Sequence, residues 1–182
     1  MKATLLCLFF AGCLTTAAAQ NGIKVGYNHA TIGGDATGIS ETAGFHAGFF
    51  FITRKQRTST MFEVLYSSQG AEVTGGGPKL TYHYVLVPVM INFYLSEGFF
   101  AQLGAQPGVL VGADVDGTDV LDQLSRLDFA AALGLGGEFE QFMINARYNY
   151  GISNTSKQQS GHYPNMVFQF SMGIKLGKKK VE

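Results

Sequence analysis

The chain has 182 residues, of which 46% are hydrophobic and 14% are charged, and its 13 basic and 13 acidic residues balance to a formal net charge of zero. A chain of this length has room for one domain, and the absence of a basic or acidic excess argues against nucleic acid or a polycation as its partner. The charged fraction is well below the quarter or so that is usual in soluble domains, so a fully water-facing exterior is not expected.

Residues 1–19 have the pattern of an export signal. Lys2 precedes an apolar stretch from Ala3 to Leu14, and Ala17-Ala18-Ala19 forms a small-residue cleavage site. We therefore predict a signal peptide with cleavage between Ala19 and Gln20. A competing interpretation is a lipobox-like sequence ending at Cys13, which would then carry a lipid.

Both cysteines, Cys7 and Cys13, lie inside this segment. The chain that remains after cleavage has no cysteine, which excludes disulfides, thiolate metal sites and cysteine nucleophiles from it. No later stretch reaches the roughly 18 apolar residues of a membrane-spanning helix.

The first four expected strands cover residues 22–31, 43–53, 58–68 and about 80–94. Each alternates apolar with small or polar residues, and such alternation places one kind on each face of a strand. In the first of them, Ile23, Val25 and Tyr27 share the apolar face. In the fourth, Pro88 has no N–H to donate, so a local bulge is expected there.

The last four expected strands cover residues 98–111, 126–138, 141–151 and 165–176. The final one shows the pattern best, because six apolar residues follow one another at every second position: Met166, Phe168, Phe170, Met172, Ile174 and Leu176. We predict that the opposite parity, mostly Gly, Ala, Asn, Gln and Ser, faces a narrow lumen, since it carries too few charges for a water-facing exterior.

Apolar-out and polar-in is the arrangement of a membrane barrel. The predicted fold is all-β: a single closed antiparallel transmembrane β-barrel of about eight strands with up-and-down topology, spanning residues 20–176. A short basic periplasmic tail, residues 177–182, follows it.

The connections between the expected strands alternate between long and short. Residues 33–42, 69–79, 112–125 and 152–164 form long connections rich in Gly, Asp, Ser and Thr, whereas residues 54–57, 95–97 and 139–140 form short ones. Outer-membrane barrels have long extracellular loops and short periplasmic turns. This predicts the outer membrane of a Gram-negative bacterium, reached after export across the inner membrane. The tyrosines lie towards strand ends, which is typical of interfacial girdles.

Six charged residues fall on the expected lumenal parity: Lys24, Glu63, Asp128, Glu138, Arg147 and Lys175. Charges in a low-dielectric interior need partners, and eight strands leave an interior just wide enough for side chains. A salt-bridged plug is the favoured interpretation, and a proton or ion path is the alternative.

Four aspartates, Asp114, Asp116, Asp119 and Asp122, are weak candidates for calcium ligands. Their glycine does not stand at the position that an EF-hand loop requires, so a solvated turn is favoured over a metal site. The four histidines show no ligand spacing. Tyr150 and Ser153 superficially resemble the rim of lipid-modifying barrels, but the required histidine and a G-x-S-x-G motif are missing. We expect no catalytic residues, no metal and no cofactor.

The sequence also resembles a known family. The runs 45–49 (FHAGF), 63–70 (EVLYSSQG), 87–89 (VPV) and 147–154 (RYNYGISN), together with the last strand, resemble the porin-like outer-membrane β-barrel family common in Bacteroidetes. The resemblance implies a small barrel of the OmpX or OmpA type, with outer-membrane lipid and the barrel-insertion machinery as partners. The tail departs from such barrels, which often end on an aromatic residue.

These observations predict an integral outer-membrane barrel that is not an enzyme. Its extracellular loops would serve surface interaction or envelope structure, with an extracellular or envelope protein as an unidentified partner. Three alternatives remain: a narrow channel for ions or small solutes, an accessory component of a secretion apparatus, and a soluble lipocalin-like ligand-binding barrel. The missing tryptophan and the low charge argue against the lipocalin alternative.

Overall fold

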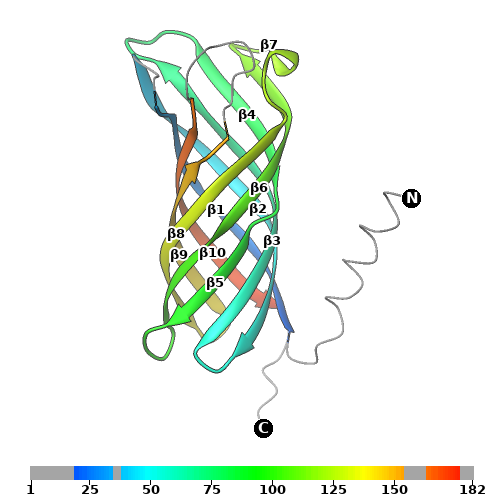
Figure 1. Ribbon diagram of the computed structural model, residues 1–182, viewed down its shortest axis with the longest axis vertical. Helices are drawn as coiled ribbons and strands as arrows, with labels where there is room; N and C mark the ends of the chain where they lie inside the picture. The colour runs from blue at the N-terminus through cyan, green and yellow to red at the C-terminus, as the bar shows by residue number, and fades with distance from the viewer. Residues whose placement is uncertain (1–18, 35–37, 154–162, 177–182) are drawn as a thin grey trace, which may run out of the picture.

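The computed structural model describes residues 19–34, 38–153 and 163–176, which form a tall ring of tilted strands (Figure 1). The strands are β1 (Ala19–Ile32), β2 (Ile39–Lys55), β3 (Thr58–Val73), β4 (Lys79–Leu86), β5 (Val89–Tyr94), β6 (Phe99–Val115), β7 (Thr118–Asp119), β8 (Leu127–Phe139), β9 (Phe142–Gly151) and β10 (Asn165–Leu176), with a short 3₁₀ helix η1 (Leu121–Gln123). Ala19 and Gln20 begin β1, whereas residues 1–18 with Cys13, and the tail 177–182, lie outside the described residues. No helix of the described residues is long and apolar enough to cross a membrane.

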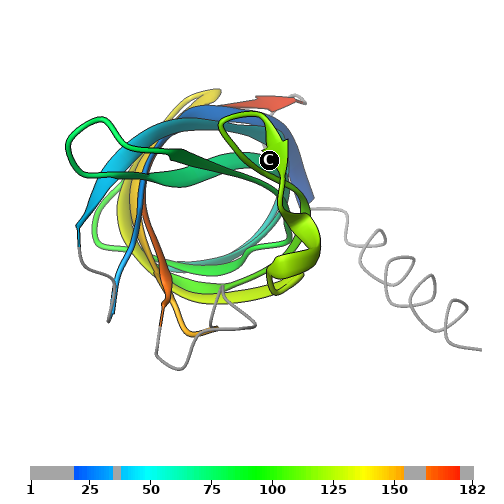
Figure 2. The ribbon, with the colours of Figure 1, turned by 90° about the horizontal axis from the view of Figure 1, so that it is seen from above.

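The sheet closes on itself because β1 pairs with both β2 and β10, with Tyr27 opposite Phe45 on one side and Phe170 on the other. All strand pairs are antiparallel, and the view from above shows a closed ring (Figure 2). β4 and β5 both pair with β3 and β6, so they are two halves of one crossing. β7 pairs only with the end of β6. The described chain thus runs between the two ends of the barrel eight times, and the predicted closed up-and-down barrel is confirmed.

The interruption between β4 and β5 falls at the expected proline. β4 ends at Leu86 and β5 begins at Val89, so Val87 and Pro88 belong to neither strand. The neighbouring strands still hold the break, because the Glu63 N–H donates to the Pro88 carbonyl and the Val87 N–H donates to the Pro107 carbonyl, both at 2.9 Å. Pro88 therefore splits the strand without opening the ring.

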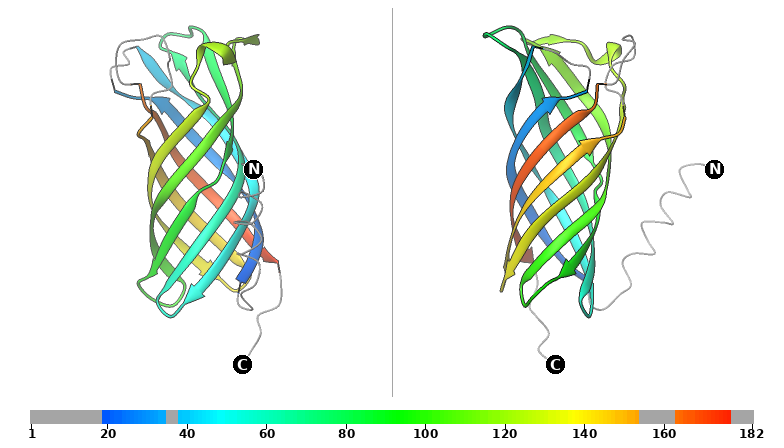
Figure 3. Two further views of the ribbon diagram at one scale, coloured as in Figure 1. Left: turned by 45° about the vertical axis from the view of Figure 1, so that its right-hand side comes forward. Right: turned by 60° about the vertical axis from the view of Figure 1, so that its left-hand side comes forward.

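The barrel has two different ends, which further views also show (Figure 3). At the turn end lie the short connections at residues 56–57, 95–98 and 140–141, together with the start of β1 and the end of β10 (Figure 1). The loop end holds the other four connections. There β2, β3 and β6 run further than predicted, since Ile39 pairs with Val73 and Asp114 pairs with Asp119. These extensions lack an apolar lipid-facing row, so their sequences were interpreted as loops.

The outer surface is apolar on every wall of the ring. Phe49 on β2, Leu103 on β6, Leu133 on β8 and Met172 on β10 are each more than half exposed, while Lys24, Asn28, Gln102 and Arg147 are buried inside. A water-soluble barrel would have the opposite arrangement, which argues against the lipocalin-like alternative. The predicted apolar-out orientation is confirmed.

The inner face is not only small and polar, because two apolar clusters fill parts of it. The turn-end cluster consists of Phe50, Ile52, Met61, Met90, Tyr94, Phe100, Ala132 and Met143. The wall cluster on β3, β4 and β6 consists of Leu65, Tyr82, Tyr84, Leu86, Leu110 and Ala113. Tyr82, Tyr84 and Tyr94 thus point inwards and are not girdle residues, because a narrow lumen has to be filled by side chains.

Replacing Leu133 with Arg is expected to lower the free energy of unfolding by about 2–4 kcal/mol, since a charge on the lipid face near the bilayer midplane loses its hydration. Leu133 lies midway along β8 and its side chain is 62% exposed on the apolar face. Urea unfolding in lipid vesicles measures the effect. The matched control is Leu95→Arg in a turn-end connection, where 73% of the side chain is exposed and little change is expected. An equal loss of unfolding free energy in both variants would contradict the assignment of Leu133 to the lipid-facing surface.

Candidate functional site

Three charged side chains from three different strands meet in the middle of the lumen. The Arg147 guanidinium on β9 donates to both carboxylate oxygens of Glu63 on β3, over 2.9 and 3.0 Å. The Lys24 ammonium on β1 also donates to Glu63. Each of the three side chains is at most 1% exposed. We call this group the central ion cluster; it ties distant walls of the barrel together across the lumen.

Glycines beside the long charged side chains leave the lumen wide enough for them to cross it. Lys24 faces Gly48 on β2 and Gly173 on β10, and Arg147 faces Gly134 on β8. A Cβ atom at Gly134 would lie 2.8 Å from Nε2 of Gln102, whose side-chain oxygen accepts a hydrogen bond from Arg147 at 3.1 Å. The small residues of the inner parity thus leave the space that the long charged side chains occupy.

A network of amides and hydroxyls continues from the central ion cluster along the inner wall. His46 contacts Asn28 through Nδ1 at 2.7 Å and Ser171 through Nε2 at 2.8 Å. Asn28 in turn donates to Ser67 at 2.9 Å and accepts from Gln169 at 3.1 Å. These residues share the inner parity with the charged ones, but no charge or motif marks them in the sequence.

The remaining predicted lumenal charges lie apart from this cluster. Glu138 accepts from Lys175 at 2.9 Å and from the Tyr94 hydroxyl, and the exposed Arg54 lies 3.7 Å away, so this group sits at the turn end. Asp128 stands alone near the loop end, where its carboxylate accepts from Ser153 and from the Phe129 N–H. The structure therefore divides the six predicted residues among three places.

Apolar side chains separate the central ion cluster from the turn-end group. On β3, Met61 follows Glu63 in the direction of the turn, and on β9, Met143 precedes Arg147 in the same direction. Both belong to the fully buried turn-end cluster. Among the described residues, this apolar cluster thus lies between Arg147 and Glu138, where a channel would need a polar path, so the geometry favours a plug over a pore.

The four aspartates of the calcium candidate stabilise their own loop. Asp114 accepts from the Gly117 N–H at 3.2 Å, Asp116 from the Lys79 N–H at 3.1 Å and Asp119 from the Leu121 N–H at 2.9 Å. Asp122 pairs with Arg126 at 3.1 Å. Their carboxylates have separate partners, and in the part of the chain that the structure describes no three His, Cys, Asp or Glu side chains are arranged to hold a metal ion.

The turn inside this loop has a clear local cause. Asp116 and Gly117 both have positive φ, 50° and 83°, as a two-residue hairpin turn of type I′ requires, and Asp-Gly is a favoured pair for it. The turn joins β6 to β7 and projects the aspartates at the loop end. Together with Glu41 and Glu72 they form what we call the acidic crown, in which the described Lys and Arg residues are Lys79 and Arg126, while His29 contacts Glu41 and His83 lies near Asp114.

Comparisons with known proteins agree with this geometry. Residues 17–157 match the family described as outer membrane protein beta-barrel domain, whereas a search of curated proteins gives no significant match. Neisserial surface protein A (NspA) has a similar structure, with a TM-score of 0.64 and 13% identity over 87% of this chain and 99% of that one.

Ail, the attachment invasion locus protein of Yersinia pestis, has a TM-score of 0.55 and 18% identity over 87% of this chain and 99% of that one. A second structure of Ail, in complex with the heparin analogue sucrose octasulfate, has a TM-score of 0.53 and 17% identity with the same coverage. At these identities the likeness shows the fold.

Proposed function

Because the chain belongs to the outer membrane protein beta-barrel domain family, we propose that it is a non-enzymatic surface protein whose loop end contacts partners outside the cell. In such barrels the longer loops are extracellular and the short turns periplasmic, so the acidic crown faces the environment. The integral outer-membrane barrel itself follows from the family and the fold. Export through a cleaved signal peptide and insertion by the barrel machinery are part of the proposal.

The observation that carries this proposal is the contrast between a filled lumen and a charged crown. In the described part of the chain, the central ion cluster and the turn-end cluster occupy the lumen, so the features that can contact a partner lie at the loop end. There Glu41, Glu72 and the four loop aspartates outnumber the basic residues of the described crown. The net charge of the whole chain is zero and gave no reason to expect a cationic partner, but this local excess of acidic residues suits one. It differs from what a polyanion such as sucrose octasulfate would need.

The arrangement around Ser153 supports a role without catalysis. Its hydroxyl donates to Asp128 and accepts from the Phe129 N–H, and within the described residues no histidine contacts it. The group beside Ser153 is thus a carboxylate and not the imidazole that activates a serine nucleophile in a Ser–His pair. His162 lies outside the described residues. The accessory role in a secretion apparatus stays a prediction.

Neutralising the crown tests the proposal. The triple variant Asp116→Asn, Asp119→Asn, Asp122→Asn keeps a side-chain oxygen at each position but removes three charges. We expect it to bind a fluorescent oligolysine peptide about fivefold more weakly in zwitterionic nanodiscs at low salt. Exposed charge contacts contribute a few tenths of a kcal/mol each, which sums to about 1 kcal/mol.

The control is Glu97→Gln with Glu140→Gln, two exposed residues of the turn end. Peptide binding to that variant should match the unmodified protein, and added salt should weaken both. Equal binding by the crown variant and the unmodified protein would contradict the acidic crown as the contact surface.

A further inference from the structure

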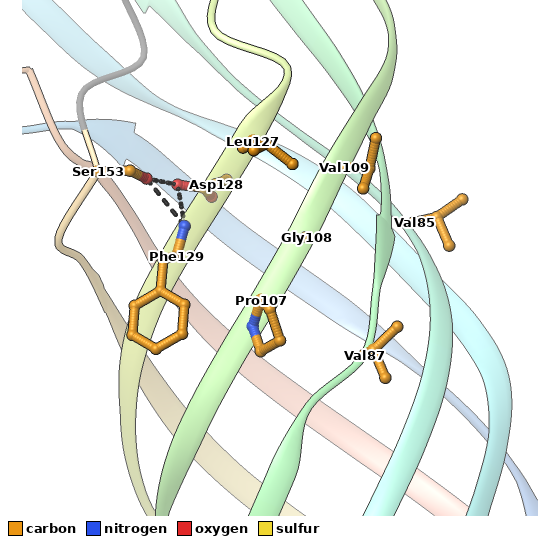
Figure 4. Close-up of a pocket in the computed structure, with 9 residues that line it drawn as sticks. All are labelled: Val85, Val87, Pro107, Gly108, Val109, Leu127, Asp128, Phe129 and Ser153. Carbon is orange, nitrogen blue, oxygen red and sulfur yellow. Dashed lines mark hydrogen bonds between the residues drawn. The ribbon is translucent and has the colours of Figure 1, made fainter. Parts of the chain in front are cut away.

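The lipid-facing side of the barrel has a hollow of about 510 Å³ across β4, β6 and β8. Figure 4 shows Val85 and Val87 on one side of it, Pro107 and Val109 on β6, and Leu127 and Phe129 on β8. The buried Asp128 and the hydroxyl of Ser153 lie at its edge, where both bind the Phe129 N–H (Figure 4). We call this hollow the outer groove.

Two features of the sequence produce the groove. The side chains on β4 and β6 are short: they are valines and Pro107. On one side of them stand the longer Leu127 and Phe129 of β8, and on the other side stands Tyr66 of β3, which pairs with Val85. The wall beneath is also irregular. The Val87 N–H donates to the Pro107 carbonyl, but Pro107 has no N–H to return the bond, and β4 ends one residue earlier.

The groove lies in the loop-end part of the apolar band. Beside it, the Tyr66 hydroxyl contacts His83 Nδ1 at 2.7 Å, and the exposed Tyr66 ring stacks on the His83 ring. Aromatic side chains with one polar end mark the membrane–water interface. Towards the turn end the same face continues through Ile91, Leu103 and Leu133, all exposed and apolar. The groove thus begins below the interface and is continuous with the lipid-facing surface.

We propose that the outer groove binds one acyl chain of an outer-leaflet lipid. Hydrocarbon is the surrounding medium at this depth, and the lining side chains gain dispersion contacts only if something fills the space between them. In lipid, such packing contacts replace the hydrophobic effect as the cause of association. The hollow is within the usual size of about 300–1,000 Å³ for small-molecule sites, and a single flexible chain can lie in it across β4, β6 and β8.

The absence of tryptophan from the sequence allows a direct test. Phe129→Trp places the sole tryptophan in the groove, and Phe170→Trp places it on the exposed face of β10, outside it. Each protein is titrated in detergent micelles with phosphatidylcholine carrying brominated acyl chains, which quench tryptophan on contact. For Phe129→Trp we expect the quenching to saturate at about one lipid per barrel. For Phe170→Trp we expect the quenching to rise linearly with added lipid and not to saturate.

Adding Val109→Phe to Phe129→Trp fills the groove and should convert its response to the linear one. Retention of the heat-dependent gel mobility of a closed barrel shows that this variant has folded. If it does not fold, Val85→Phe is used in place of Val109→Phe to fill the groove. Equal linear responses at both tryptophans would overturn the proposal. The proposal would also be overturned if brominated lipid did not quench the tryptophan of Phe129→Trp and crosslinking showed that a second copy of the chain covers the groove.

Discussion

Replacing Glu63 with Gln is expected to lower the free energy of unfolding of the barrel by about 3–5 kcal/mol, the cost of removing one partner from a buried ion pair. Glu63 is fully buried and is the anion that pairs with both Lys24 and Arg147. Glutamine has nearly the same shape and can still accept a hydrogen bond, but it leaves two buried cations without an anion. Urea unfolding in lipid vesicles, followed by the loss of heat-dependent gel mobility, measures the change.

Two further variants show whether charge is the cause. Glu72→Gln makes the same chemical change in the acidic crown, where it should alter the stability by less than about 0.5 kcal/mol. Replacing the whole cluster by Lys24→Met, Glu63→Leu and Arg147→Met should recover most of the loss, because apolar residues of similar volume often substitute for buried ion groups without cost. A stable Glu63→Gln variant would show that the two cations find other partners in the lumen.

Replacing Phe50 with Ala is expected to lower the free energy of unfolding by about 3–5 kcal/mol, as is usual for a buried phenylalanine. Its ring is fully buried in the turn-end cluster beside Met61, Met90 and Phe100. Part of the space for this ring comes from Gly173, where a Cβ atom would lie 2.9 Å from Phe50 Cε1. On the side of Gly22 and Gly173 the ring lies against backbone, which cannot move in to fill the cavity.

The same change also tests the closed lumen. We expect the unmodified barrel to be silent in planar lipid bilayers. The double variant Phe50→Ala, Phe100→Ala removes both phenylalanine rings of the apolar cluster between the central ion cluster and Glu138, so it should conduct ions. Phe49→Ala is the matched control, since this adjacent side chain points outwards and is 58% exposed. Conductance by the unmodified protein, or a silent double variant that is folded, would contradict the assignment of the turn-end cluster as the barrier.

The sequence was sufficient for the architecture because alternation and composition act together. Alternation places Phe49 and His46 on opposite faces, and the low charge decides which face meets lipid. Tyr82 and Tyr84 stand on the parity opposite Val85, so alternation places them on the inner face. The girdle prediction for these two residues followed their position near a strand end and left this parity out. The extension of β3 to Val73 was missed for a different reason: a strand that rises above the membrane needs no apolar row.

The partners within the lumen were beyond the reach of sequence patterns. Glu63 meets Lys24 and Arg147 because of the tilt of the strands and the offset between them, which no local pattern encodes. Asp128 shares their parity and yet lies near Ser153 at the loop end. The aspartates of the candidate calcium loop are close in sequence, but the type I′ turn at Asp116 and Gly117 directs them to different backbone amides.

The central ion cluster also constrains the order in which the barrel is assembled. Lys24 and Glu63 are both present once the first three strands have formed, but Arg147 arrives only with β9, 84 residues after Glu63, and the β1–β10 seam needs the last strand of all. Contacts between such distant segments form late in folding. A half-built sheet would therefore hold its ionic centre incomplete and exposed, so the ion cluster stabilises the closed ring far more than any open intermediate and makes closure cooperative.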